Sequence, residues 1–179
     1  MIILPPKILD LANNYVQDKV TVESHFRTFC PQHLDTYEKK QAFVANAKRA
    51  EAACASHLGL DPVIAVNWIQ GDQADPGYDL IKEGWRIDVK STNPGRFLLI
   101  WPAETGIEVL PRKQLDFLAL IIGEVDMWNP PKFVAKGDFL KHHTMVRNEG
   151  KKLRVGTAFM HNDDLDSWAL ALKKYWKYS

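Results

Sequence analysis

The 179-residue sequence predicts a single α/β domain, in which a mixed sheet is flanked by helices. Helical spacing of apolar residues dominates residues 7–58, short β-branched and alternating segments follow over 63–101, and an apolar run at 116–125 is typical of a buried strand. Hydrophobic residues make up 46% and charged residues 25% of the chain, which is typical of a soluble globular protein. A chain of this length can bury a core without disulfide crosslinks.

Two helices are predicted in the N-terminal third. Apolar side chains at helical spacing predict a short amphipathic helix over residues 7–20. A longer helix is predicted over 36–58, with Asp35 or Thr36 as its N-cap and Gly59 directly after its last turn. We therefore expect a helical layer before the first strand.

One acidic residue, Glu51, lies inside the apolar stripe of the longer helix. A carboxylate on the core-facing side of a helix is costly to bury unless a partner offsets its loss of water. Two interpretations remain open: Glu51 extends to solvent at the edge of the core, or it meets a partner.

Short strands are predicted after Gly59, where the apolar pattern changes from helical spacing to alternation. They cover residues 63–68, 78–81, 85–90 and 96–101, and the last three form a meander. Glu83-Gly84 predicts a tight hairpin turn within it. The remaining elements are a short helix over 111–115, a strand over 116–125 that is apolar on both faces, and helices over 136–147 and 162–176.

Two aspartates lie on neighbouring strands of the predicted hairpin. Side chains alternate along a strand, so Asp88 and Lys90 share one face of segment 85–90 while apolar residues occupy the other. If the hairpin pairs as predicted, Asp79 and Asp88 converge within reach of one cation. Hard divalent ions such as Mg²⁺ prefer oxygen ligands, so the spacing predicts a magnesium site.

This constellation resembles the PD-(D/E)XK nuclease superfamily, which has a restriction-endonuclease-like fold. Asp79 is followed, after eight residues, by Asp88-Val89-Lys90, and the helix A-N-A-K-R-A-E-A-A-C-A-S-H-L-G-L resembles the first core helix of that superfamily, with Glu51 as its acidic residue. The sequence departs from the pattern at one point, since Tyr78 stands where the family name has proline. The bare motif is short, and its context on adjacent strands makes it more specific.

The resemblance implies a domain plan within the single domain 1–179. Residues 43–125 would form the catalytic core, with the element order α-β-β-β-α-β. Residues 1–42 would be a helical N-terminal extension, and residues 126–179 a basic insertion followed by C-terminal helices.

The resemblance also implies a role for each site residue. Asp79, Asp88 and the Val89 carbonyl would bind Mg²⁺, for which Mn²⁺ can substitute, and Glu51 would bind a second metal ion or orient its water. Lys90 would hold the attacking water or neutralise charge on the phosphate. The implied activity is that of a metal-dependent DNA endonuclease, which hydrolyses phosphodiester bonds in line.

Basic residues are concentrated near the C-terminus, although the net charge of the chain is only +1. Such a stretch can bind a phosphate backbone, and equally it can be a solvated surface. The nucleic-acid-binding candidates are Ser91, Thr92, Lys136, Lys141, Lys151, Lys152 and Arg154. DNA is therefore the expected partner, and a homodimer would allow both strands of a duplex to be cut.

Two alternatives to an active nuclease remain. The first is a catalytically silent nucleic-acid-binding or assembly subunit with the same fold, and the second is an unrelated α/β protein whose acids bind structural calcium. Cys30 and Cys54 lack the spacing of zinc ligands. No apolar run reaches the roughly 18 residues of a membrane span, and the N-terminus lacks a signal-peptide pattern, so a cytoplasmic protein is expected.

Overall fold

The computed structural model describes residues 1–26, 34–67, 76–103, 105–147 and 155–178. Its helices are α1 (Pro6–Tyr15), α2 (Lys19–Ser24), α3 (Tyr37–His57), α4 (Pro62–Val66), α5 (Lys136–His142) and α6 (Trp168–Tyr178), with 3-10 helices η1 (Ile107–Arg112) and η2 (Asn162–Asp164). Its strands are β1 (Ile2–Ile3), β2 (Leu80–Lys82), β3 (Trp85–Thr92), β4 (Leu98–Trp101), β5 (Phe117–Glu124), β6 (Met127–Trp128), β7 (Lys132–Ala135), β8 (Thr144–Met145) and β9 (Ala158–His161).

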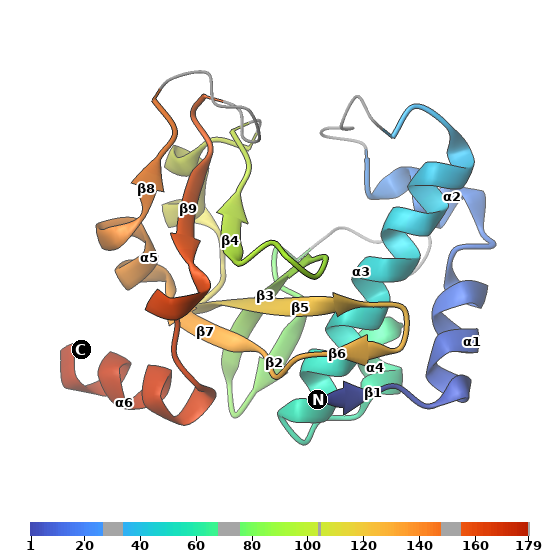
Figure 1. Ribbon diagram of the computed structural model, residues 1–179, viewed down its shortest axis with the longest axis horizontal. Coiled ribbons are helices and arrows are strands. Elements are labelled where there is room, and N and C mark those ends of the chain that lie inside the picture. The colour runs from blue at the N-terminus through green and yellow to red at the C-terminus, as the bar shows by residue number, and fades with distance from the viewer. Residues whose placement is uncertain (27–33, 68–75, 104, 148–154, 179) are drawn as a thin grey trace.

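The strands form two sheets, and helices pack against them, which confirms a mixed α/β fold (Figure 1). The larger sheet has the order β1-β6-β5-β3-β2, and β7 also pairs with β5. Strands β3 and β5 are parallel, whereas the other pairs in this sheet are antiparallel. The smaller sheet has the order β4-β9-β8. Among the described helices, none has the length and apolar character needed to cross a membrane.

Strand β5 separates two hydrophobic cores. Alternate residues of β5, beginning with Phe117, face the core formed with α1, α3 and α6, and the residues between them, beginning with Leu118, face the core formed with β4, β9 and α5. Every residue from Phe117 to Gly123 is buried. The prediction of a strand that is apolar on both faces is confirmed.

Helix α3 begins and ends where its sequence predicts. The Thr36 side chain accepts a hydrogen bond from the Lys39 N–H, which caps the N-terminus. At the other end Gly59 has a φ of 71°, and the Leu60 N–H donates to the Ala55 carbonyl at 2.9 Å. This is the Schellman arrangement, in which a left-handed residue after the helix satisfies its last carbonyls.

The hairpin between β2 and β3 also follows its turn residues. Glu83 and Gly84 both have positive φ, 53° and 87°, as a two-residue primed turn requires. The strand prediction for 78–81 is two residues early at its start, because β2 begins at Leu80.

The predicted strand over 63–68 is wrong, because the structure has helix α4 at Pro62–Val66. Asp61 caps this helix by accepting a hydrogen bond from the Val63 N–H at 2.9 Å, and Pro62 occupies its first turn. These local start signals outweigh the β preference of the valines and isoleucine. Trp68, at the end of the predicted strand, lies outside the described residues.

The prediction that segment 96–101 joins the meander of β2 and β3 is also wrong. Strand β4 forms at Leu98–Trp101, but it pairs with β9 in the smaller sheet. The side chains of Leu99 and Trp101 on β4 pack with Ala158 and Met160 of β9 in the second hydrophobic core, which places β4 beside β9 rather than beside β3.

Four helix predictions need new boundaries. The segment 7–20 contains parts of two helices: α1 ends at Tyr15, and Asp18 caps the N-terminus of α2 with its side chain. Instead of a helix over 111–115, the 3-10 helix η1 ends at Arg112. The C-terminal helices are shorter than predicted: α5 ends at His142 and α6 begins at Trp168.

A partly buried ion pair connects the start of β3 to the start of β5. Arg86 donates to Asp116 from Nε at 3.0 Å and from Nη2 at 3.1 Å, and its backbone N–H donates to the same carboxylate at 2.9 Å. Burial alone would raise the pKa of Asp116, but the hydrogen bonds from Arg86 outweigh this effect and lower the pKa below 3.8.

We predict that Asp116→Asn lowers the free energy of unfolding at pH 7 by about 2 kcal/mol, because charge-assisted hydrogen bonds to Arg86 are lost. A carboxylate with a lowered folded-state pKa stabilises the fold above its unfolded pKa, and this contribution is lost as the pH falls through the folded pKa. The difference between variant and wild type in urea unfolding should therefore shrink below pH 3.8. Asp10→Asn, which removes an exposed carboxylate on α1, is the control. A constant difference from pH 7 to pH 2 would contradict the assignment.

Candidate active site

Helix α3 supplies two charged residues to the interior. Glu51 is 6% exposed and Lys48, one turn earlier, is 1% exposed. Lys48 Nζ donates to Glu51 Oε2 at 2.7 Å. Glu51 is thus buried with a charged partner, and the interpretation in which it extends to water is wrong.

The hairpin brings Asp79 beside Asp88. Leu80 pairs with Ile87 in the antiparallel ladder, so continuing this register by one residue places Asp79 opposite Asp88. The Asp79 N–H donates to the Ile87 carbonyl at 2.8 Å, and Asp79 Oδ2 accepts a hydrogen bond from the Val89 N–H at 2.6 Å. The two aspartates therefore lie side by side on the predicted hairpin.

Asp88 and Lys90 share one face of β3, as their alternation predicts, and they form an ion pair. Lys90 Nζ lies 2.9 Å from Asp88 Oδ1 and 2.7 Å from Oδ2. The same ammonium lies 5.5 Å from the centre of the Trp101 ring on β4. Asp88 is only 9% exposed, so its carboxylate is largely withdrawn from solvent.

These five side chains form one charged cluster, consisting of Lys48, Glu51, Asp79, Asp88 and Lys90. Burial raises the pKa of Asp79 well above 3.8, and the negative charges of Glu51 and Asp88 raise it further, whereas Lys90 and Lys48 lower it. All four neighbours therefore lie close enough to act on Asp79. Two other carboxylates, those of Glu51 on α3 and Asp88 on β3, therefore lie near this residue.

The Lys48–Glu51 pair is shaped by burial as well. Burial raises the pKa of Glu51, Lys48 opposes this change, and Asp88 adds to it. For Lys48, burial acts to lower the pKa of the ammonium, but the charges of Glu51 and Asp79 outweigh burial and raise it. Lys48 therefore stays protonated at neutral pH, inside the core.

The oxygen donors of the cluster are of the type that Mg²⁺ prefers. Asp88 Oδ2 is buried and accepts no hydrogen bond in the part of the chain that is described, although Lys90 Nζ lies 2.7 Å away. As arranged, no three His, Cys, Asp or Glu side chains among the described residues are placed to hold a metal ion. The donor chemistry fits a divalent cation, but in this arrangement each carboxylate is engaged by a lysine or a backbone N–H.

The predicted nucleic-acid-binding residues that the structure describes lie at the end of β3 and on α5. Ser91 is exposed and Thr92 is half-buried at the end of β3, next to the cluster in sequence. Lys136 Nζ donates to the Lys113 carbonyl at 3.0 Å, so this ammonium is engaged by the protein itself. Lys141 is exposed on α5. Three candidates, Lys151, Lys152 and Arg154, lie outside the described residues.

Sequence reasoning missed Lys48 and its neighbour Tyr15. The Tyr15 ring centre lies 5.1 Å from Lys48 Nζ, and Tyr15 is buried on α1. A signal for Lys48 was present in the sequence, because a lysine three residues before a stripe glutamate lies on the same face of a helix. Tyr15 carries no such signal, since its approach depends on how α1 packs on α3.

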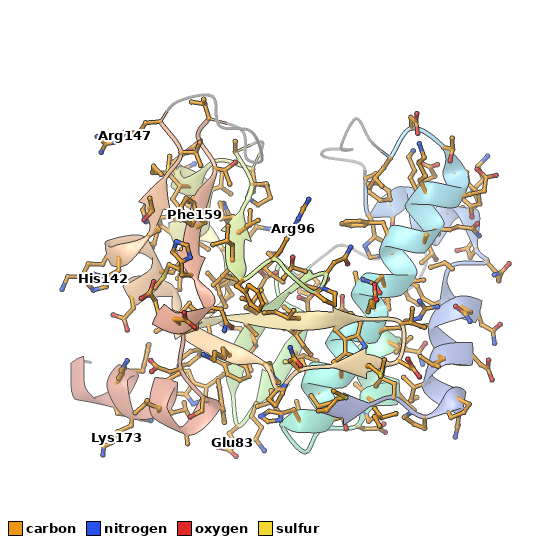
Figure 2. The ribbon with its side chains drawn as sticks, in the orientation of Figure 1. Glu83, Arg96, His142, Arg147, Phe159 and Lys173 are labelled. Atoms are coloured by element: carbon orange, nitrogen blue, oxygen red, sulfur yellow. The ribbon has the colours of Figure 1, made fainter. Side chains whose placement is uncertain are left out.

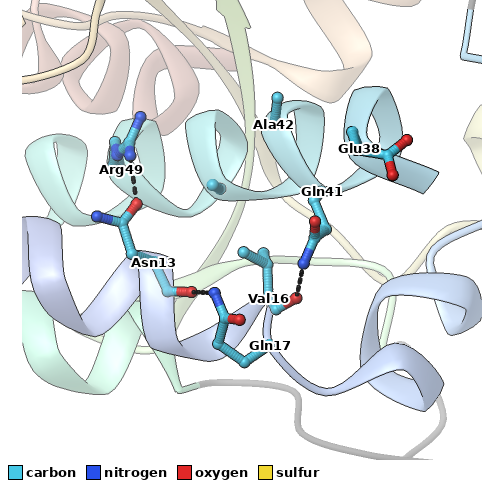
Figure 3. A pocket seen from close by; sticks show the side chains of 8 residues that line it. Asn13, Val16, Gln17, Glu38, Gln41, Ala42 and Arg49 are labelled. Carbon is cyan, nitrogen blue, oxygen red and sulfur yellow. Dashed lines mark hydrogen bonds between the residues drawn. The ribbon is translucent and has the colours of Figure 1, made fainter. Parts of the chain in front are cut away.

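A separate groove lies between α1 and α3 (Figure 3). Its volume is about 370 Å³, and Asn13, Gln41 and Arg49 contribute polar groups to it. Arg49 Nη2 donates to Asn13 Oδ1 across the groove. The side chains of the charged cluster do not line this groove, so it is not part of the candidate active site.

The charged cluster combines buried carboxylates, a buried ammonium and a second, partly exposed ammonium. Such a set can bind a divalent cation, hold a water molecule or exchange a proton, since like-charged acids compete to be ionised. No protein-family model, curated protein or solved structure matches this chain.

We predict that Asp79→Asn stabilises the protein at pH 8 in EDTA, by on the order of 1 kcal/mol. Because the folded-state pKa of Asp79 is raised, the folded protein binds more protons than the unfolded chain, and the free energy of unfolding falls as the pH rises from 3.8 through the folded pKa. Asparagine can still accept the Val89 hydrogen bond, but it carries no charge.

Urea unfolding of both proteins at pH 4 and pH 8 checks this prediction, with Asp10→Asn on the surface of α1 as the control. The stabilisation should be present at pH 8 and small at pH 4. A variant that is less stable than wild type at pH 8 would show that the Asp79 charge supports the fold.

Proposed function

We propose that this protein is a Mg²⁺-dependent endonuclease of the PD-(D/E)XK type, which hydrolyses phosphodiester bonds in DNA. One observation carries the proposal: Glu51, Asp79, Asp88 and Lys90, singled out by their sequence pattern, come from a helix, a bend and a strand and meet in one charged cluster. Structural acids at the protein surface would not need to converge in the interior.

In the proposed mechanism, Asp79 and Asp88 hold the divalent cation together with the Val89 carbonyl. A strand residue directs its N–H and its C=O to the same edge, and the Val89 N–H already contacts Asp79, so this carbonyl faces the Asp79 side. Bound Mg²⁺ would supply Lewis acidity for attack on the phosphate. Mn²⁺ is expected to substitute for it.

Lys90 and Glu51 have different roles in this proposal. The Lys90 side chain is 33% exposed, so its ammonium can reach a bound phosphate and stabilise negative charge as it develops. Glu51 is buried beside Lys48, and it would orient a water molecule at the inner side of the cluster.

The same proposal assigns α3, β2, β3 and β5 to a restriction-endonuclease-like core. Strand β3 carries Asp88 and Lys90 at its centre, and α3 packs on the face opposite these two side chains. In this assignment the third core strand, β4, has moved into the smaller sheet, and the second core helix is reduced to the 3-10 helix η1.

A catalytically silent nucleic-acid-binding subunit is the second candidate. The observation that favours it is the internal pairing of the acids, because Glu51 contacts Lys48, Asp88 contacts Lys90, and Asp79 contacts a backbone N–H. A cluster whose charges are already offset can hold the sheet together without binding a metal ion.

The turn after β3 offers a contact for a nucleic acid. Arg96 and Phe97 are exposed there, and the Arg96 N–H donates to the Asn93 carbonyl at 3.2 Å, which closes the turn. Arg96 follows Lys90 by six residues, a span of at most about 20 Å. Figure 2 shows its side chain extending from the turn toward the side of the molecule where α3 lies. A guanidinium here can contact a phosphate close to the cluster.

We predict that wild type cleaves DNA with Mg²⁺ or Mn²⁺, and that Asp88→Asn and Lys90→Met slow cleavage at least about a hundredfold. Asparagine preserves the shape of the nearly buried Asp88 side chain, so loss of activity can be separated from loss of folding by circular dichroism. Substrates are plasmid, single-stranded DNA, a four-way junction and RNA, each with Mg²⁺, Mn²⁺, Ca²⁺ or EDTA. Asp163→Asn, at an exposed position, should match wild type.

Metal-dependent cutting that survives in both variants would overturn the assignment of the site. Binding of DNA without cutting, under every metal condition, would favour the silent subunit. Light scattering of the free and DNA-bound protein tests the proposed homodimer in the same samples.

We predict that Arg96→Ala weakens binding to a DNA duplex and reduces the salt dependence of the logarithm of the binding constant by about 1, because one phosphate contact is lost. Lys173→Ala is the matched control, since Lys173 is exposed on α6 and Figure 2 shows it pointing away from the molecule. Fluorescence anisotropy measures DNA binding by both variants between about 50 and 200 mM salt, a range over which phosphate contacts weaken strongly. Equal behaviour of the two variants would place the DNA elsewhere.

A further inference from the structure

Lys48 is the most deeply buried charge in the described part of the molecule. Its side chain is among the largest that are fully buried, and its ammonium contacts Glu51 Oε2 at 2.7 Å. The ring of Tyr15 covers it at 5.1 Å, and its charge also acts on Asp79. This ammonium is therefore built into the inner side of the charged cluster.

Packing alone does not account for a charge at this position. An ammonium loses its hydration when it is buried, and a buried ion pair is often no more stabilising than apolar residues of the same volume. Methionine would fill a similar space between α1 and α3. The positive charge of Lys48 therefore acts on the carboxylates around it, and filling space in the core does not require it.

Lys48 also affects how many metal ions the cluster can hold. Three carboxylates and two ammonium groups carry a formal charge of −1, which one divalent cation more than offsets. In a two-metal nuclease the ions lie about 3.5–4 Å apart and share carboxylates between them. A second cation at Glu51 would meet the Lys48 ammonium, which already contacts that carboxylate.

We infer that Lys48 takes the place of a second metal ion: its ammonium holds Glu51, and the site binds one divalent cation, at Asp79 and Asp88. This inference rests on the proposed function and makes Lys48 a positioning residue. It assigns Glu51 to the orientation of water, not to metal binding. The cation enters from the side of Lys90, which is partly exposed, whereas Lys48 closes the inner side.

The number of Mn²⁺ ions bound per chain tests the inference without any cleavage assay. Isothermal titration calorimetry and electron paramagnetic resonance of wild type should give one Mn²⁺ per chain. Lys48→Met should gain a second, weaker Mn²⁺, because Glu51 is freed, while Lys48→Arg should retain one. Glu51→Gln should also bind one Mn²⁺, with an affinity within about threefold of wild type, since the amide leaves the Asp79–Asp88 site intact.

The outcomes separate this inference from the proposed function. Two Mn²⁺ ions per wild-type chain, or loss of the ion in Glu51→Gln, would overturn the inference and leave a metal-dependent nuclease in place. A folded Lys48→Met variant that still binds one ion would overturn it as well. If Lys48→Met does not fold, wild type and Glu51→Gln decide the question. No Mn²⁺ binding by wild type, together with no cleavage, would refute both proposals.

Discussion

Strand β3 is hydrogen-bonded to a neighbour along each edge, and the position of the charged cluster follows from this constraint. Its pairing with β2 covers only Trp85–Ile87 and places Asp79 beside Asp88, while its parallel pairing with β5 continues to Thr92. Strand β4 pairs with β9 in the smaller sheet, where Trp101 lies against the ammonium of Lys90. The β2 pairing thus brings the two aspartates together, and the smaller sheet supplies the aromatic surface beside Lys90.

The second constraint is the close approach of α3 to this sheet. Ala52, Ala53, Cys54 and Ala55 are completely buried, and their small side chains allow the helix backbone to lie near β3 and β5. Glu51 directly precedes this run and is only 6% exposed, so its carboxylate is buried as well. Burial of such a charge requires a cation, which Lys48 supplies from the preceding turn of the same helix.

Local patterns predicted the parts of the site that depend on neighbouring residues in sequence. The turn at Glu83-Gly84 and the alternation of Asp88 and Lys90 are local properties of the hairpin, and both are confirmed. Non-local pairing was not predictable in the same way, because the sequence of β4 is compatible with either sheet. The 63–68 segment failed for a local reason: Asp61 and Pro62 start a helix that β-branched residues then continue.

Charge runs were the least informative pattern. A basic stretch shows only that lysines are frequent there, whereas the structure shows that the Lys136 ammonium already donates to the Lys113 carbonyl. Lys48, in contrast, lies beside Arg49 in an alanine-rich helix, and of these two cations it is Lys48 that contacts Glu51, at 2.7 Å. Which ammonium is directed inward depends on tertiary packing, and composition carries no information on that point.

The charged cluster begins where the β2–β3 ladder ends, because the same residue, Asp79, takes part in both. The Ile87 carbonyl faces the β2 edge, so the Val89 N–H, two residues on, faces the same edge, beyond the first residue of β2. A backbone N–H at that position needs an acceptor, and Asp79 supplies it from its side chain. The Asp79 carboxylate is therefore held by the backbone N–H of Val89, the residue that follows Asp88. This hydrogen bond gives Asp79 a fixed position, although burial raises its pKa. A fixed position is what the proposed site requires of an acid that binds a cation.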